Sequence, residues 1–367
     1  MNVPFFSNNK ISRSISSQWI AGITNVIESQ SFIEGDFVQE FEREFATYTD
    51  SKYAIGVSNG LDGLVLALRA AGIGTGSVVA VPAHTFIATF LAVIHVGGTP
   101  LAIDVDEQGL IDLDKLFQKQ QKIDAVIPVH MHGCMVDMQK LVIWSKQRNV
   151  TVIEDASQAH GASRDGVKAG QIGDLSVFSL YPTKNLGAIG DAGIVTTSVL
   201  QYKEYLQSAK SYGRHIDSKY THTRLGYNAR LDTIHAAVLL VNLKNLDAWN
   251  FHRNKLASLY RDLLYDLPLD FLINQKTESV YHHFPILSED RDELMDFLKR
   301  KGIGSEIHYP ELASNEIALL ANLQFDEVPI ASSISARTLS LPLSQWHTEE
   351  EVEYVSKQII EFFKGKN

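Results

Sequence analysis

A lysine near the middle of the chain occupies a position better suited to chemistry than to packing. Lys184 follows an alternating apolar run, Leu175 to Leu180, which predicts a strand that is ended by a proline. The glycines that come next, Gly187, Gly190 and Gly193, predict a tight turn into another strand, Gly193 to Thr197. An amine at such a strand end can form a Schiff base with a carbonyl compound and can carry protons. We therefore expect Lys184 to lie in a pocket and to bind pyridoxal phosphate (PLP).

A PLP site also needs a carboxylate beside the pyridine nitrogen, because a protonated ring draws electrons from the reacting carbon. Asp155 directly follows a predicted strand, Val150 to Glu154, and is the candidate for this partner. Gln158, in the polar loop that comes next, could donate a hydrogen bond to the ring phenolate. Glu154 and Asp155 could instead only cap the following segment. Their closeness to the lysine motif in the sequence favours function.

The phosphate needs hydrogen-bond donors, preferably at the N-terminus of a helix. The segment Ser58-Asn-Gly-Leu-Asp-Gly63 joins a predicted strand, Ala54 to Ser58, to a predicted helix, Leu61 to Ala71. Its glycine would let the backbone approach a phosphate, although the same residues could form only a turn with an acid in the first helical turn. The expected donors are the amides of Gly60, Leu61 and Asp62 and the hydroxyl of Ser179.

Several further side chains could complete the site. Phe86 could stack on the pyridine ring or could be an ordinary core residue. Arg214, Asn228 and Arg230 form a polar, partly basic patch that suits anionic groups, or else a solvated loop. His130 and His132 resemble metal ligands, but no second ligand pair lies nearby in the sequence, so we expect them to be structural and predict no metal. The expected substrate contacts are His84, Tyr181, Arg214, Lys219, Arg230, His308 and Tyr309.

The elements that must position these residues alternate between short apolar strands and helices from Tyr53 to Thr197, which predicts an α/β fold with a mostly parallel sheet. Among them we expect a strand from Val78 to Val81 and a helix from Thr85 to Val96. Ligands bind at the ends of such strands. A long helical stretch, Ala229 to Leu264, would connect to a smaller α+β unit. That unit would hold a strand, His282 to Leu287, a second strand, Ile303 to His308, and a final helix, Glu349 to Lys364. We expect two domains, residues 1–245 and 246–367.

Bulk composition narrows the class of protein. The 367 residues include 45% hydrophobic and 21% charged residues, and the formal net charge is -10, which argues against a general nucleic-acid binder. A single cysteine, Cys134, excludes an intramolecular disulfide and fits a reducing compartment. No signal peptide and no apolar run long enough for a membrane span are visible. We expect a cytoplasmic protein that binds neither nucleic acid nor membrane.

Taken together, these segments resemble the nucleotide-sugar aminotransferases of the DegT/StrS type, within PLP fold type I. The resemblance covers nearly the whole chain. Its most specific pieces are Glu154-Asp-Ala-Ser-Gln-Ala-His-Gly161, Tyr181-Pro-Thr-Lys-Asn-Leu-Gly187, Gly226-Tyr-Asn-Ala-Arg-Leu-Asp232 and His308-Tyr-Pro310.

The resemblance implies roles for these residues. Lys184 would bear the Schiff base and Asp155 would face the pyridine nitrogen, while Gln158 would contact the ring oxygen. Phe86 would be the stacking ring. Leu61 stands where relatives commonly have threonine, so its phosphate contact would come from the backbone only. The protein would be a homodimer with shared active sites, in which Asn228 reaches the phosphate of the second subunit.

The resemblance further implies transfer of the amino group of L-glutamate, which becomes 2-oxoglutarate, to a dTDP-linked keto sugar. The phosphate loop and the segment Pro82 to Thr89 favour members that act at C3 of a dTDP-6-deoxy-3-ketohexose. The product would be a 3-amino-3,6-dideoxy sugar of the fucose or glucose configuration, used in bacterial surface polysaccharide such as the O-antigen. Three alternatives remain open: a C4 aminotransferase on a 4-keto sugar, another PLP reaction such as that of a lyase, and a non-catalytic PLP-binding regulatory protein.

Overall fold

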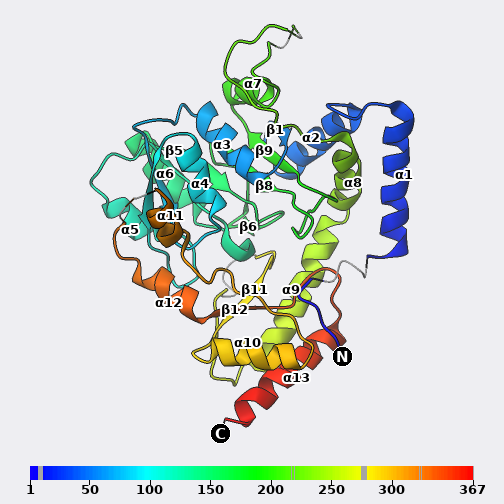
Figure 1. Cartoon of the computed structure of the whole chain (residues 1–367), viewed down its shortest axis with the longest axis vertical. Coiled ribbons are helices and arrows are strands. Elements are labelled where there is room, and N and C mark those ends of the chain that lie inside the picture. The colour runs from blue at the N-terminus through cyan, green and yellow to red at the C-terminus, as the bar shows by residue number, and fades with distance from the viewer. Residues whose placement is uncertain are drawn as a thin grey trace.

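The computed structural model describes residues 1–6, 11–215, 217–218, 220–273, 279–321, 323 and 325–366. A central sheet with helices on both faces forms the larger part, and a smaller sheet with two long helices lies beneath it in Figure 1. None of the helices described there is long and apolar enough to cross a membrane.

The central sheet contains seven of the described strands, in the order β1-β9-β8-β5-β4-β2-β3. They are β1 (Tyr53–Val57), β9 (Gly193–Thr197), β8 (Leu175–Ser179), β5 (Thr151–Asp155), β4 (Ala125–Val126), β2 (Val78–Pro82) and β3 (Thr99–Ile103). The neighbours from β8 to β3 pair in parallel, whereas β9 runs antiparallel to both β1 and β8. The expected mostly parallel α/β sheet is therefore confirmed.

Each face of the central sheet packs against its own set of helices, because successive residues of a strand point to opposite faces. In β8, Val177 belongs to the hydrophobic cluster that holds α3 (Gly60–Ala70), α4 (Ala88–His95) and α7 (Leu200–Ala209). Its neighbour Phe178 belongs to the opposite cluster, with α2 (Asp36–Tyr48), α6 (Met138–Arg148) and α8 (Thr233–Leu243). The helix α1 (Arg13–Ser29) lies outside α8 (Figure 1).

The smaller sheet has the order β10-β11-β12 and is antiparallel. Its strands are β10 (Asp270–Phe271), β11 (Phe284–Leu287) and β12 (Thr338–Leu341), and its helices are α9 (Leu246–Leu264), α10 (Arg291–Arg300) and α13 (Glu349–Lys364). Two further helices, α11 (Ala313–Ala321) and α12 (Pro329–Arg337), pack into the cluster that holds α3 and α4. The remaining elements are α5 (Leu113–Gln118), η2 (Met131–Gly133), β6 (Ser163–Arg164) and β7 (Val167–Lys168).

Several expected boundaries are wrong. The stretch Ala229 to Leu264 is not one helix, because a turn at Lys244 and Asn245 separates α8 from α9. Residues 303–308 form no strand, and only isolated bridges at Ile303 and Glu306 remain. The third strand of the smaller sheet is β12 instead, which the sequence did not reveal.

The helix expected from Thr85 begins three residues later, at Ala88, and this difference leaves Thr85 and Phe86 in an irregular segment at the end of β2. Glycines such as those after Lys184 can permit a tight turn through a left-handed backbone conformation. None of Gly187, Gly190 and Gly193 has a positive φ. At Gly193 a Cβ would instead meet the backbone of Asn59 at 2.6 Å, so close approach between two loops requires glycine there.

Candidate active site

A cavity of about 710 Å³ lies at the carboxyl ends of β5 and β8 and at the N-terminus of α3. This is the edge where ligands bind in sheets of this kind. Many of the expected site residues line it, namely Gly60, Leu61, Phe86, Asp155, Gln158, Ser179, Tyr181, Lys184, His308 and Tyr309. The cavity therefore gathers residues from both parts of the chain.

Lys184 enters this cavity from the loop that follows β8. The turn is closed by a hydrogen bond from its backbone N–H to the Tyr181 carbonyl at 2.9 Å. Burial lowers the pKa of the Lys184 amine to about 8, while the nearby Asp155 carboxylate acts in the opposite direction. A lysine with this pKa is partly neutral near physiological pH, as a nucleophile and proton carrier must be.

Asp155 lies at the end of β5 and is only 5% exposed. Its Oδ2 accepts a hydrogen bond from the Thr89 hydroxyl at 3.0 Å, and its Oδ1 accepts from the Ser157 backbone N–H at 3.2 Å. The Thr89 hydroxyl also lies 3.0 Å from the hydroxyl of Thr85, which lines the cavity. These contacts fix the carboxylate in one orientation at the wall of the cavity.

Three segments converge around the first turn of α3. A Cβ at Gly60 would lie 3.0 Å from the Cβ of Ser179 and 3.4 Å from the Ser157 hydroxyl oxygen, so only glycine leaves this space open. Helix N-terminal amides and hydroxyl groups are suitable donors for a phosphate. Asn59, Gly60, Leu61, Ser157 and Ser179 all line the cavity at this corner.

Asp62 does not line the cavity. Its backbone N–H donates to Asn59 Oδ1 at 2.8 Å, and Asn59 Nδ2 donates back to the Asp62 carboxylate at 2.8 Å. The Ser58 hydroxyl binds the same carboxylate. Asn59 thus caps α3, and the Asp62 carboxylate holds the Asn59 side chain in place. The backbone N–H of Asp62 is already bonded, so Gly60 and Leu61 remain the predicted phosphate donors.

Gln158 is held in one orientation by the backbone. Its Oε1 accepts from the His132 N–H at 2.7 Å, and its Nε2 donates to the Tyr309 hydroxyl at 3.2 Å. An amide nitrogen has two hydrogens, so the second remains available on the cavity side. The contact of Gln158 with a ring oxygen stays a prediction for this second hydrogen.

Aromatic rings form another wall of the cavity. Phe86 is 55% exposed, so the alternative that it is a core residue is wrong. Its ring centre lies 5.6 Å from that of Tyr309. His308 stacks on His283 with ring centres 3.8 Å apart, and burial lowers the pKa of His308 to about 4. These rings offer flat, uncharged surfaces to a bound heterocycle.

Other expected contacts lie outside the cavity. His84 lies behind the wall, where its Nε2 accepts from the Tyr309 N–H at 3.3 Å, and burial lowers its pKa to about 4. Asn228 is exposed and accepts from the Arg230 guanidinium at 2.6 Å. Lys219 lies outside the described residues.

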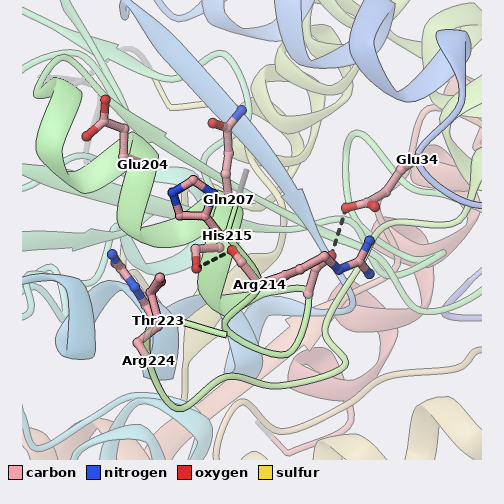
Figure 2. A pocket seen from close by; sticks show the side chains of 9 residues that line it. Glu34, Glu204, Gln207, Arg214, His215, Thr223 and Arg224 are labelled. Carbon is pink, nitrogen blue, oxygen red and sulfur yellow. Dashed lines mark hydrogen bonds between the residues drawn. The ribbon is translucent and has the colours of Figure 1, made fainter. Parts of the chain in front are cut away.

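Arg214 belongs to a separate cavity of about 440 Å³, shown in Figure 2. Glu34, Glu204, His215 and Arg224 also line it, so both signs of charge are present. The Ser211 hydroxyl donates to Glu34 at 2.8 Å (dashed in Figure 2). Within one chain, therefore, Arg214 does not reach the cavity of Lys184.

The two histidines that resemble metal ligands diverge. His130 Nε2 lies 2.9 Å from Glu154 Oε2, and both side chains are fully buried. Burial alone would raise the pKa of Glu154, but the contact with His130 and two backbone amides hold it below its usual value. His132 points instead toward His283, with 3.2 Å between the Nδ1 atoms. Among the described residues, no group of three or more His, Cys, Asp and Glu side chains could hold a metal ion.

The cavity residues fit PLP. The open space at Gly60 suits a phosphate, Gln158 offers an N–H group, Phe86 presents an exposed ring, and Lys184 and Asp155 supply the amine and the carboxylate. No hydrogen bond or ion pair of the Lys184 amine is present in the described part of the chain.

The sequence had not singled out Thr85, Thr89 or Ser157, although Ser157 stands inside the recognised Asp-Ala-Ser-Gln segment. His282 and His283, which the sequence suggested were structural, also line the cavity. The only signal for the threonines was their position after the strand expected from Val78 to Val81.

Comparison with known proteins shows which family the chain resembles over most of its length. The model of the DegT/DnrJ/EryC1/StrS aminotransferase family matches residues 13–360. The chain is 37% identical to dTDP-3-amino-3,4,6-trideoxy-alpha-D-glucose transaminase of Streptomyces venezuelae, over 93% of this chain and 91% of the relative. It is 36% identical to dTDP-3-amino-3,6-dideoxy-alpha-D-galactopyranose transaminase of Aneurinibacillus thermoaerophilus, over 97% and 98% of the two chains.

Two further similarities extend over almost the whole length. A relative from Geobacillus stearothermophilus, named a pleiotropic regulatory protein, is 35% identical over 99% of both chains. The crystal structure of S. venezuelae DesV superposes with a TM-score of 0.94 at 35% identity, covering 98% of each chain. The chain therefore belongs to the DegT/DnrJ/EryC1/StrS aminotransferase family, whose cofactor is PLP.

Proposed function

We propose that the enzyme transfers the amino group of L-glutamate to C3 of a dTDP-6-deoxy-3-ketohexose, giving a dTDP-3-amino-3,6-dideoxyhexose. The observation that carries this proposal is one cavity that holds Lys184, Asp155 and the glycine corner at Gly60. The two transaminases named for dTDP-3-amino sugars support the position on the sugar and the nucleotide. The single cysteine supports action in the cytoplasm.

When bound, PLP withdraws electrons from the carbon that carries the amino group, so that a proton on this carbon becomes acidic. Lys184 is the only side chain we assign to move this proton. Its amine, with a pKa of about 8, is close to the value that serves both removal and return of a proton near neutral pH. The same residue acts for glutamate and, in the opposite direction, for the sugar.

The other cavity residues orient and bind. Asp155, fixed by Thr89, places a negative charge where the pyridine nitrogen would lie, and thereby favours its protonated form. The amides of Gly60 and Leu61 and the hydroxyls of Ser157 and Ser179 would hold the phosphate. Gln158 would donate to the ring oxygen, and the ring of Phe86 would cover one face of the cofactor.

We also propose a homodimer with shared active sites. A nucleotide sugar carries a diphosphate, and anions of this kind are usually bound by arginine. The residues that line the cavity within the described chain include no arginine. Arg214 and Arg230 lie elsewhere, as does Asn228, which is exposed. A second copy could bring these groups to the cavity.

One observation favours a second candidate function. The relative named a pleiotropic regulatory protein is similar over nearly the whole chain, so a PLP-binding protein without turnover is the competing hypothesis. It predicts that the purified protein binds PLP but releases no 2-oxoglutarate with any keto sugar.

The test compares purified enzyme with PLP, L-glutamate and two substrates side by side, a dTDP-6-deoxy-3-ketohexose and the matching 4-keto compound. Release of 2-oxoglutarate is followed by a coupled assay, and the position of the new amine is determined by NMR. A rate at least about tenfold higher with the 3-keto sugar supports the proposal. Turnover of the 4-keto sugar alone would overturn the position, and turnover of neither would favour the regulatory protein.

A further inference from the structure

Tyr309, in the cavity wall, is held at three points by distant parts of the chain. Its backbone N–H donates to His84 at 3.3 Å, and its hydroxyl accepts from Gln158 at 3.2 Å. Its carbonyl accepts from the hydroxyl of Ser335 at 2.9 Å, and the same hydroxyl lies 3.1 Å from the Pro310 carbonyl. Ser335 is in the last turn of α12 and is only 6% exposed.

The helix α12 is in turn fixed at both ends. The N–H groups of Ile330 and Ala331, in its first turn, donate to the Asp104 carboxylate at 3.3 and 2.9 Å. At its other end, the Arg291 guanidinium donates to the carbonyl of Ser335 at 3.2 Å. A negative group at a helix N-terminus and a positive group at its C-terminus both stabilise the helix. The position of α12 is therefore set at one end by the large sheet and at the other by α10.

Asp104 is suited to hold the helix because it directly follows β3 and is 4% exposed. Lys115 approaches its Oδ2 to 2.5 Å, and the Val105 N–H donates to its Oδ1 at 2.9 Å. Burial by itself would raise the pKa of Asp104, but these hydrogen bonds and those from α12 lower it. A buried carboxylate that stays ionised binds its donors more strongly than a neutral group would.

The strand that follows α12, β12, forms hydrogen bonds with the rest of the cavity wall near Tyr309. In β12, the Ser340 N–H donates to the Glu306 carbonyl at 2.8 Å, and the Ser340 hydroxyl lies 3.0 Å from His308 Nδ1. Glu306, His308 and Tyr309 all line the cavity. The wall segment 306–310 thus depends on α12 and β12 for its position, and α12 depends on Asp104.

We propose that Asp104 and Ser335 are positioning residues of the aminotransferase: Asp104 fixes α12, and Ser335 fixes the Tyr309 backbone so that the Tyr309 hydroxyl stays on Gln158 at the cavity. Neither residue lines the cavity. The proposal deepens the proposed function and rests on it only where the keto sugar is used as a probe.

The first experiment compares Ser335→Ala with Ser335→Thr, which keeps the hydroxyl, in the PLP-loaded enzyme. Ser332→Ala is the matched control, because Ser332 lies in the same helix, is exposed, and its hydroxyl donates to the carbonyl of Val328, the residue just before the helix. Amide hydrogen exchange of a peptide that contains Tyr309 reports on the wall without any substrate. Steady-state kinetics with the keto sugar report on the site.

We expect Ser335→Ala to speed exchange at Tyr309 by about tenfold and to raise the KM for the keto sugar by about fivefold, with kcat changed less than twofold. Ser335→Thr should restore both values to within about twofold, and Ser332→Ala should leave them unchanged. Unchanged exchange in Ser335→Ala, or failure of Ser335→Thr to restore it, would overturn the positioning role.

The second experiment tests whether Asp104 acts through Ser335. Asp104→Asn removes the charge that holds α12, and Asp326→Asn is its control, because Asp326 precedes α12 but is exposed and pairs only with Lys119. We expect Asp104→Asn to speed exchange at Tyr309 and Asp326→Asn to leave it unchanged. The double variant Asp104→Asn/Ser335→Ala should exchange no faster than the more affected single variant.

Additive effects in the double variant would mean that Asp104 acts elsewhere, and this part of the proposal would fall. Failure of the positioning role can be distinguished from failure of the proposed function, because hydrogen exchange needs no substrate. Faster exchange without any turnover of the keto sugar would leave the positioning role intact and would contradict the proposed function instead.

Discussion

The hydroxyl of Thr89 donates a hydrogen bond to the carboxylate of Asp155 at 3.0 Å, across 66 residues of sequence. Thr89 is fully buried at the start of α4, and Asp155 ends β5. The bond therefore links a helix on one face of the sheet to the edge where the cofactor would lie. It fixes the direction of the one carboxylate on which the electron demand of a bound pyridine ring would depend.

Replacement of Thr89 by valine should slow the reaction without preventing cofactor binding. Valine has nearly the same shape but no hydroxyl, so Asp155 would keep only the donor from the Ser157 backbone, and its orientation would be less fixed. Because a hydrogen bond to a charged group contributes about 1.5–3 kcal/mol, we expect kcat to fall by at least about tenfold. Thr89→Ser keeps the hydroxyl and should stay within about threefold of the wild type; equal loss in both variants would contradict the role of this bond.

Asp155→Asn should bind PLP but turn over slowly. The amide keeps the size of the side chain and removes the negative charge that would favour a protonated pyridine nitrogen. We expect a decrease in kcat of about 100-fold or more, measured with saturating cofactor. A near-normal rate would show that Asp155 does not control the electron demand of the ring.

Lys184→Ala should abolish turnover and the covalent hold on the cofactor. Removal of a proton-transfer group costs about 10²–10⁴-fold in rate, and without the amine PLP should separate from the protein during gel filtration. Lys146→Ala is the matched control, because Lys146 is exposed on α6 and lies outside the cavity. A Lys184→Ala protein that keeps either property would contradict the assignment.

The reactivity of Lys184 should depend on pH in a distinctive way. Burial lowers the pKa of its amine from 10.5 to about 8, so the reactive neutral form appears at lower pH than in a free lysine. In protein freed of PLP, acetylation of Lys184 should reach half its maximal rate near pH 8, as measured by mass spectrometry. A midpoint near that of a lysine in a short peptide, about 10.4, would show that burial does not act on this amine.

The lowered pKa also has a consequence for stability. Between about pH 8 and 10.5 the unfolded chain binds the proton that the folded Lys184 has released, so stability rises with pH in this window. The effect should be seen as a gain of the PLP-free wild type over Lys184→Met between pH 7.5 and about 10 in urea unfolding. A constant difference across this range would contradict the sign.

Gly60→Ala should weaken cofactor binding. The added Cβ would lie 3.0 Å from the Cβ of Ser179 and would fill the corner assigned to the phosphate. Because overpacking of this kind costs about 1–3 kcal/mol, the Kd for PLP should rise by about tenfold or more in a fluorescence titration. Gly74→Ala is the control, since its nearest neighbour would be 3.5 Å away; equal effects of the two substitutions would exclude a phosphate site at Gly60.

Local patterns were sufficient for much of the fold. The strand at Gly193–Thr197 and the helix at Glu349–Lys364 have the expected bounds, because an apolar period of two or of 3.6 residues is a property of neighbouring residues. The alternation of strands and helices likewise led to the parallel sheet. Where local signals are weak, as in residues 303–341, the expected elements were wrong or missing, and α11, α12 and β12 became visible only in the structure.

The candidate site residues likewise divide into those that the sequence predicted and those that only the structure revealed. Lys184 follows β8, Asp155 ends β5 and Gly60 begins α3. Parallel strands bring such ends to one edge, so the sequence alone could predict that these three residues would line one cavity. The partners of these groups come from segments distant in the sequence: Thr89 for Asp155, and Ser335 for Tyr309. No local pattern specifies such pairs, because they depend on how whole elements pack against one another, and only the tertiary structure decides them.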